Sequence, residues 1–381
     1  MKVFLECFGC EQRQLDSEQI LKTFISNNAV VTKNIYEADV AIVTTCGVTK
    51  KAIEQSISLM DSIFNKCNGS CRLVVSGCLP WILPSIKTRF SSTSFIRPGT
   101  LSGIRELLSS LLRGSGDSMN DDLRQESNTS RWDISVERSI FNTARQEYDC
   151  AKAGYKIVIN HGCLSNCSYC AIRKATGQLV SVTEEKIYKQ VKKAAISEES
   201  TIMLMGGDVG AYGKDKESSF VHLLKNIIEI QECPRLFLHD YNMKWFAQQL
   251  DELNAVTSIN PDKVGAIMVP VQSGSSKILS MMNRNYDSKT AQESLVRFKN
   301  HNANIVIGTH IIVGFPGEGE DDFKETCCFL KNAPIDFISC FPYSNIEGTE
   351  ASRLAQVPEE IILERLAVMQ SMFSGKIKIF F

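Results

Sequence analysis

Short apolar runs alternate with longer segments of mixed polarity through about the first 112 residues. Three of these runs are rich in β-branched residues and predict strands at Lys2–Glu6, Val40–Thr44 and Arg72–Ser76. The segments between them predict helices that begin near Asp16 and Val48. This alternation predicts an α/β domain over residues 1–112.

The chain then becomes polar. Residues 113–131 are dominated by small and charged side chains and lack the apolar groups that a core requires. We therefore expect a linker over residues 113–150.

A second series of apolar runs begins near Tyr155. Six strand candidates are separated by segments of helical length: Lys156–Asn160, Thr201–Met205, Arg235–His239, Ala266–Val271, Ile305–Val313 and Asp336–Phe341. Repeated strand–helix units predict a parallel sheet or an open barrel over residues 151–350, with loops at the carboxyl edge of the strands. Residues 351–381 hold a helical segment, Pro358–Phe373, and a short apolar tail, so we expect a helical extension and no further domain there.

Composition narrows the class of protein. The apolar fraction of 43% in 381 residues is that of a globular protein, and the formal charge of -1 argues against a strongly basic chain that coats nucleic acid. Neither a secretory signal nor a membrane-spanning apolar run is apparent, which favours a cytoplasmic protein with no membrane partner. Fourteen cysteines in such a chain favour metal binding or catalysis over a disulfide framework.

Three of the cysteines are closely spaced directly after the first strand of the second domain. Cys163, Cys167 and Cys170 form a CxxxCxxC pattern. Three thiolates so close together can hold one iron–sulfur cluster, and a [4Fe–4S] cluster usually takes four cysteines. One iron would then lack a protein ligand and could bind another molecule.

A second set of three cysteines lies in the first domain. Cys10, Cys46 and Cys78 each follow one of the three predicted strands. Parallel strands would bring all three to the same edge of a sheet, where they could hold a second cluster. The alternative is that they are small buried hydrophobic residues.

For the other eight cysteines we prefer the buried, structural interpretation. Cys7 forms a CxxC with Cys10 but lies within the first strand, and the pair Cys67 and Cys71 lies in a loop. The five histidines lack sequence partners for a catalytic triad, so structural roles are expected for His161 and His310 too.

The position of the CxxxCxxC pattern resembles the radical S-adenosylmethionine (SAM) superfamily, and further motifs resemble its methylthiotransferase family. In the first domain these are Phe8–Gln12, Thr45–Val48 and Ser76–Cys78; in the second they are Met205–Gly213, Pro270–Ser275, Met282–Arg284, Ile312–Glu318 and Phe341–Ser344. The resemblance implies a flavodoxin-like parallel α/β domain followed by a partial (βα)6 barrel.

The resemblance also implies two [4Fe–4S] clusters and SAM as cofactors. One cluster would be bound by Cys163, Cys167 and Cys170, where SAM binds the open iron, and an auxiliary cluster by Cys10, Cys46 and Cys78. The residues expected to contact SAM are Tyr169, Gly206, Gly207, Asp208, Gln272, Ser273, Arg284, Gly314 and Pro316. For these residues the structural alternatives are a packed aromatic, turn glycines, local turn capping and a solvated helix charge.

The implied reaction uses two SAM molecules. One would give a methyl group to sulfur at the auxiliary cluster, and the second would be cleaved to a radical that removes hydrogen from an unactivated C–H bond before methylthio transfer. The reaction requires an external one-electron donor, such as flavodoxin or ferredoxin, and a sulfur donor.

The substrate is open between two classes. The Gly162–Leu164 and Gly210–Gly213 stretches resemble the branch that acts on C2 of threonylcarbamoyladenosine in tRNA. Relatives usually carry a terminal RNA-gripping β-barrel, the TRAM domain, which we do not expect here, and they commonly have Asn at the positions of Arg13 and Thr44. With the near-neutral charge, this favours a peptide or protein substrate slightly over tRNA. A non-catalytic electron carrier or RNA-binding protein fits less well, because both cysteine triplets and the SAM-like loops are present.

Overall fold

The computed structural model describes residues 1–67, 69–99, 104, 106–108, 155–197 and 200–380. Two compact units are distinguished by their internal contacts. One contains the described residues up to 108 together with Ala171–Thr176, and the other contains residues 155–170 and 177–380. The expected linker over 113–150 lies outside the described residues, so the domain bounds of the sequence analysis stay predictions.

The first unit is built on a five-stranded parallel sheet with the order β2-β1-β3-β4-β5. Its strands are β1 (Lys2–Cys7), β2 (Val30–Val31), β3 (Val40–Thr45), β4 (Arg72–Gly77) and β5 (Ser94–Ile96). This is the strand order of flavodoxin-like folds, in which ligands bind at the carboxyl ends of the strands. The fold expected for this part of the chain is confirmed.

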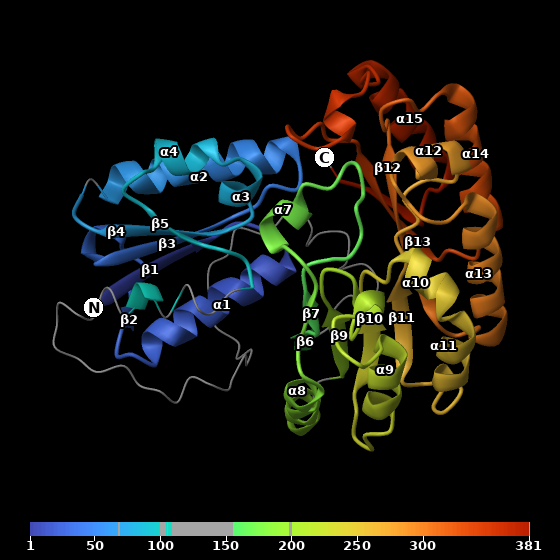
Figure 1. Ribbon diagram of the computed structural model, residues 1–381, viewed down its shortest axis with the longest axis horizontal. Helices are drawn as coiled ribbons and strands as arrows, with labels where there is room; N and C mark the ends of the chain where they lie inside the picture. Colours follow the sequence, from blue (N-terminus) through green and yellow to red (C-terminus); the bar gives the residue numbers. More distant parts are fainter. Residues whose placement is uncertain (68, 100–103, 105, 109–154, 198–199, 381) are drawn as a thin grey trace. The chain divides into compact units, whose positions relative to one another are not determined.

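The apolar runs of this sheet are continuous because both of its faces are covered. Along β3, Val40 and Ile42 pack into a core with α1 (Glu11–Ile25), whereas Ala41 and Val43 pack into a second core with α2 (Lys50–Cys67). Figure 1 shows α1 on one face of the sheet and α2 on the other. The remaining helices of this unit are η1 (Ile35–Glu37), α3 (Leu79–Ile82), α4 (Ser85–Arg89) and α7 (Ile172–Thr176).

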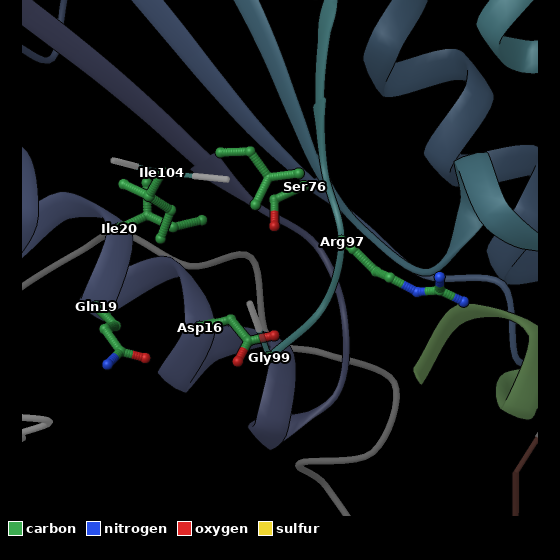
Figure 2. Close-up of a pocket in the computed structure, with 8 residues that line it drawn as sticks. Asp16, Gln19, Ile20, Ser76, Arg97, Gly99 and Ile104 are labelled. Carbon is green, nitrogen blue, oxygen red and sulfur yellow. The ribbon is translucent and has the colours of Figure 1, made fainter. Parts of the chain in front are cut away.

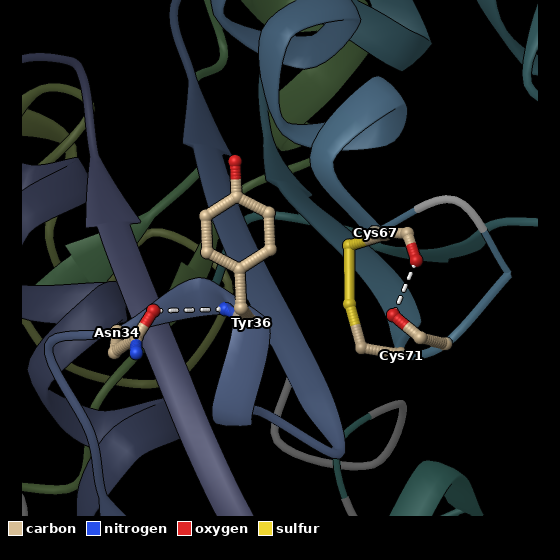
Figure 3. The surroundings of a disulfide bond; sticks show 5 residues. Asn34, Tyr36, Cys67 and Cys71 are labelled. Atoms are coloured by element: carbon tan, nitrogen blue, oxygen red, sulfur yellow. Dashed lines mark hydrogen bonds between the residues drawn. A yellow bond between two sulfur atoms is a disulfide. The ribbon is translucent and has the colours of Figure 1, made fainter.

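A disulfide joins Cys67, at the end of α2, to Cys71, just before β4 (Figure 3). Reduced thiols were expected at these two positions, and that expectation is wrong for this pair. The sequence separation is only 4 residues, so the tight turn itself brings the two side chains together. Within the same turn the Ser70 hydroxyl donates to the Cys67 carbonyl.

The second unit contains a seven-stranded sheet in which every strand lies beside its predecessor along the chain. All of its pairings are parallel, and the order is β14-β13-β12-β11-β10-β9-β6. The strands are β6 (Tyr155–Val158), β9 (Thr201–Met205), β10 (Arg235–Leu238), β11 (Val264–Met268), β12 (Val306–Val313), β13 (Phe337–Pro342) and β14 (Ile377–Ile379). The predicted open arrangement of strand–helix units is confirmed.

The apolar tail, expected as part of a helical extension, adds a strand to the sheet of the second unit. It forms β14, which pairs in parallel with β13 through Ile338 and Ile377. Phe380 stacks on Phe341, with ring centroids 5.0 Å apart. A separate antiparallel pair is formed by β7 (Asn160–His161) and β8 (Val180–Ser181).

The helices of the second unit are α8 (Glu184–Ile196), η4 (Val209–Ala211), α9 (Phe220–Ile228), α10 (Met243–Gln248), α11 (Leu250–Thr257), α12 (Ser276–Met281), α13 (Ser288–His301), α14 (Glu320–Asn332), η5 (Ala351–Arg353) and α15 (Glu359–Met372). Most of them pack onto its sheet through one large core, whereas α12 and η5 contribute to a smaller cluster with Phe315. Among the helices of the described ranges, none is long and apolar enough to cross a membrane.

Candidate functional site

Cys10, Cys46 and Cys78 of the first unit each follow a strand of its sheet. Cys10 precedes α1 and its carbonyl accepts from Arg13 N at 2.8 Å, while Cys78 precedes α3. Cys46 is held on both sides of its backbone by the Ser56 hydroxyl, which accepts from Cys46 N and donates to Cys46 O at 2.9 Å each. Helix starts and a buried hydroxyl therefore fix the backbone of all three positions.

Glycines let the three loops approach one another. Gly77 has φ +105°, and a Cβ there would collide with the Thr45 carbonyl. A Cβ on Gly47 would lie 2.6 Å from Ile82 Cδ1. At the edge of the sheet that carries the cysteines, the backbone at Gly77 therefore packs directly on Thr45, and the backbone at Gly47 packs directly on Ile82.

Burial is the main electrostatic influence on the Cys46 thiol. It raises the pKa of Cys46, and the neighbouring Cys10 and Cys78 raise it further. None of the three is in a disulfide. In the described part of the chain, no three His, Cys, Asp or Glu side chains are gathered to bind a single metal ion. A cluster separates its ligands by its own width, so three converging reduced thiols fit an iron–sulfur cluster better than a single ion.

A buried ion pair lies beside these cysteines. Arg13 Nη1 is 2.9 Å from Asp16 Oδ2 on the same helix. Asp16 also lines a small pocket (Figure 2). The other lining residues are Gln19, Ile20, Ser76, Ile96, Arg97, Gly99 and Ile104. Thr44 is linked to the same helix, because its hydroxyl is 2.6 Å from the Ser17 hydroxyl.

The CxxxCxxC loop of the second unit is held by contacts with distant segments. Cys163 N donates to Gly177 O at 3.4 Å, and Cys163 Sγ accepts from Ser165 N at 3.3 Å. Ser168, between the other two cysteines, donates to the carbonyls of Met281 and Met282. Burial raises the pKa of Cys163 to about 11, and the nearby Asp208 contributes to this rise.

The glycine-rich loop after β9 packs against the start of the cysteine loop. Asn160 donates to Asp208 O at 2.7 Å and accepts from Gly207 N at 3.0 Å. A Cβ on Gly207 would collide with Gly162 O, and one on Gly206 would collide with Asn160. These two glycines therefore permit close packing of protein on protein, whether or not they also admit a ligand.

Asp208 is the most buried acid at this edge of the second sheet. Its carboxylate accepts from Asn242 N at 3.3 Å, and only 2% of the residue is exposed. Burial raises its pKa to about 6, against the influence of Asn242 and Arg284.

Arg284 reaches the cysteine loop directly. Its Nη1 donates to Cys167 Sγ at 3.5 Å and its Nη2 donates to Pro270 O at 3.2 Å, while its buried Nε has no hydrogen-bond partner among the described residues. Tyr169 packs, partly buried, against an apolar group that includes Phe315. Three thiols beside a guanidinium with an unused donor fit an iron–sulfur cluster here also.

The other expected SAM contacts have mixed surroundings. Gln272 has φ +76°, and both polar groups of its backbone are hydrogen-bonded: its N donates to His310 O and its O accepts from Ile312 N. The Ser273 hydroxyl accepts from Ser275 N at 3.2 Å, as the local turn alternative expects, and it also lies 3.2 Å from the hydroxyl of the distant Thr326. Gly314, at φ +78°, faces Ile362, and Pro316 is buried in the same loop. Their roles toward SAM stay predictions.

One polar cluster was missed by the sequence analysis. His239 Nδ1 lies 2.9 Å from Asp240 Oδ2, and His310 Nδ1 lies 3.9 Å from Asp240 Oδ1. The three residues come from β12 and the end of β10, which are not adjacent in the sheet, so sequence spacing gave no signal for their meeting.

Comparison with known proteins assigns both parts of the chain. The profile described as the radical SAM superfamily matches residues 157–330, and that of uncharacterized protein family UPF0004 matches residues 2–93. A threonylcarbamoyladenosine tRNA methylthiotransferase, MtaB, from Aquifex aeolicus is 30% identical over 380 residues, which cover 99% of this chain and 88% of that protein. The chain belongs to the radical SAM methylthiotransferase family. This methylthiotransferase is also similar to a tRNA-2-methylthio-N(6)-dimethylallyladenosine synthase from Rickettsia bellii, at 29% identity over 97% of this chain and 82% of that protein.

Solved structures support the fold of this methylthiotransferase. The radical SAM methyltransferase TsrM from Kitasatospora setae, solved with cobalamin and a [4Fe–4S] cluster, matches with a TM-score of 0.65 at 13% identity, over 89% of this chain and 74% of that one. The radical SAM enzyme OxsB matches with a TM-score of 0.56 at 15% identity, over 97% of this chain and 56% of that one. As a member of its family, the methylthiotransferase uses SAM and [4Fe–4S] clusters.

Proposed function

We propose that the chain is a tRNA methylthiotransferase that modifies C2 of an adenosine already altered at N6, with threonylcarbamoyladenosine as the first candidate. The observation that carries this proposal is the 30% identity to a threonylcarbamoyladenosine tRNA methylthiotransferase across 99% of the chain. The similarity to dimethylallyladenosine enzymes supports the same substrate class. The peptide substrate favoured by the near-neutral charge has no such support.

In this proposal each cysteine triplet has its own task. Cys10, Cys46 and Cys78 bind the auxiliary cluster, and Cys163, Cys167 and Cys170 bind the cluster that receives SAM. When bound, these groups supply the sulfur, the methyl group and the one-electron chemistry of the reaction. An external one-electron donor and a sulfur donor complete the requirements.

In this proposal the side chains around the second triplet bind and orient the cluster and SAM. The Arg284 guanidinium donates to Cys167 Sγ and so helps to orient that sulfur. Asp208 presents a buried carboxylate that suits a cationic amino group such as that of SAM. The close packing of Gly207 on Gly162 holds the two loops against each other.

The substrate is tested in a host that lacks its own tRNA methylthiotransferases. We expect expression of the chain to yield an adenosine nucleoside heavier by one SCH2 unit, detected by mass spectrometry of hydrolysed tRNA. The product should disappear when Cys163, Cys167 and Cys170 are all changed to Ala, and persist in Cys328→Ala, which alters an exposed cysteine outside both triplets. A methylthiolated peptide with unmodified tRNA would refute the tRNA assignment, and methylthiolated dimethylallyladenosine would refute only the choice of adenosine.

A further inference from the structure

We propose that Arg13 is a positioning residue for the auxiliary cluster: its Nε–H and Nη1–H groups donate to sulfur of a cluster held by Cys10, Cys46 and Cys78, and its charge offsets that of the thiolates. This inference rests on the proposed assignment of those cysteines as cluster ligands. It concerns the reduction potential of the cluster and does not depend on which substrate is modified.

The backbone places Arg13 beside the cysteines. Arg13 follows Cys10 by three residues in the first turn of α1, a spacing that puts both on one side of the helix. A Cβ on Gly9 would lie 2.9 Å from Arg13 Cβ and 3.8 Å from Cys46 Cβ. The stem of Arg13 therefore passes directly over Gly9, next to Cys46.

The guanidinium of Arg13 is buried with donors unused. Only 1% of the residue is exposed, and its Nε and Nη1 have no hydrogen-bond acceptor among the described residues. Asp16 is close enough to offset its charge but does not accept a hydrogen bond from Nη1. Buried donors without acceptors are costly, so a structure that retains two of them in one side chain is expected to supply the acceptor with a bound group.

Asp16 and the three thiols are the groups whose charges act on this guanidinium. Burial lowers the pKa of Arg13, but Asp16 and then Cys78, Cys10 and Cys46 raise it, and the net direction is upward. Arg13 is the only buried cation in the described part of the first unit. Three thiolates bound to iron would otherwise be buried without any positive charge beside them, which is unfavourable.

A consequence for the cluster follows. Hydrogen bonds to cluster sulfur and a nearby positive charge both stabilise the reduced state, which carries one more negative charge, and so raise the reduction potential. An Asn at this position would offer two amide donors and no charge. The auxiliary cluster should therefore be easier to reduce with Arg13 than with Asn at the same position.

The test isolates the auxiliary cluster. Cys163, Cys167 and Cys170 are changed to Ala in the full chain, which is reconstituted anaerobically and titrated with dithionite while the reduced cluster is followed by electron paramagnetic resonance. Arg13→Gln should lower the one-electron reduction equilibrium constant by about tenfold or more, a shift of about 59 mV or more toward negative potential. Arg13→Lys should give an intermediate shift, because lysine keeps the positive charge but lacks the planar set of donors of a guanidinium.

Arg89→Gln is the matched control, since it removes an exposed arginine from the same unit and should leave the potential unchanged. A wild-type potential in iron-loaded Arg13→Gln would overturn the proposal. If Arg13→Gln does not fold, Arg13→Lys decides, and a wild-type potential in that variant would likewise overturn it. If the chain with Ala at Cys163, Cys167 and Cys170 and with Arg13 unchanged binds no iron, the assignment of Cys10, Cys46 and Cys78 as cluster ligands is refuted. Measuring the iron content separates that result from the others.

Discussion

At the scale of single residues, both triplets share one device, which is an arginine beside thiols. Arg284 donates to Cys167 in the second unit, and Arg13 lies beside Cys10 and Cys46 in the first. A nearby guanidinium favours the thiolate, whereas burial alone favours the neutral thiol. In each unit a guanidinium thus lies beside cysteines that are proposed to bind a cluster.

Gly77 is expected to tolerate no side chain. Gly77→Ala combines a φ of +105° with a collision against the Thr45 carbonyl, and should lower the free energy of unfolding by more than about 3 kcal/mol. Gly69→Ala is the control, because Gly69 has φ +76° with nothing within 4 Å, and should cost only about 1–2 kcal/mol. Urea unfolding of the iron-free chains gives both values, and equal losses would show that the close approach of β3 and β4 does not matter.

Single residues were predictable where type and position in the chain carry the signal. The six cysteines of the two triplets stand out because they follow predicted strands, and their role as cluster ligands stays a prediction. The burial of Arg13 was not foreseen, because a charged side chain on a helix is usually solvated and only the tertiary packing hides it. The meeting of His239, Asp240 and His310 likewise depends on sheet order, which spacing does not reveal.

At the scale of elements, the buried central strands were the predictable ones. β9 was predicted with its observed bounds because a strand covered on both faces is apolar throughout. β2 and β5 were missed, since they have only 2 and 3 residues, and both residues of β2 are exposed. β14 was taken for a tail because an edge strand of 3 residues has no periodic pattern.

Glu318 ties the loop after β12 to α15 and makes its stability depend on pH. Its carboxylate accepts from Gly314 N at 2.7 Å and lies 2.8 Å from Arg365 Nη1. Burial nevertheless raises the pKa of Glu318 from 4.5 to about 7, with Gly314 and Arg365 acting in the opposite direction. Between these pH values the folded chain holds a proton that the unfolded chain has released, so the free energy of unfolding falls as the pH rises.

Glu318→Gln should remove this dependence. Relative to wild type, we expect the variant to gain about 3 kcal/mol of stability as the pH is raised from 4 to 8. The measurement is urea unfolding of the iron-free chain at both pH values. Glu320→Gln, at an exposed position on α14, should show no such change. A difference between Glu318→Gln and wild type that is constant with pH would contradict the assignment.

At the scale of the whole molecule, the two triplets belong to separate compact units. Each unit has its own sheet and its own cores. Loss of one cluster should therefore leave the other site folded.

This independence can be measured by iron content. Reconstituted wild type should bind about eight irons, as two [4Fe–4S] clusters. The variant with Ala at Cys10, Cys46 and Cys78 should bind about four and still cleave SAM to 5′-deoxyadenosine when reduced. The variant with Ala at Cys163, Cys167 and Cys170 should also bind about four and yield no 5′-deoxyadenosine. Loss of all iron in either variant would mean that the two sites do not form independently.

The substrate class was the weakest inference at this scale. A formal charge of -1 averages over the whole chain and does not locate a basic surface, so it gave no sound reason to prefer a peptide. Similarity to a tRNA enzyme over 99% of the chain is the stronger argument, because it covers both units together.

The backbone of Gln272 has a consequence for substitution at this position. A glutamine held at φ +76° stores about 1–3 kcal/mol of strain that a glycine would not. The hydrogen bonds to His310 and Ile312 set that angle from outside, so no local adjustment relieves it. Replacement by glycine would relieve this strain and would also remove the amide side chain. If that side chain contacts SAM, as the sequence analysis expects, Gln272→Gly should gain backbone freedom and lose SAM binding.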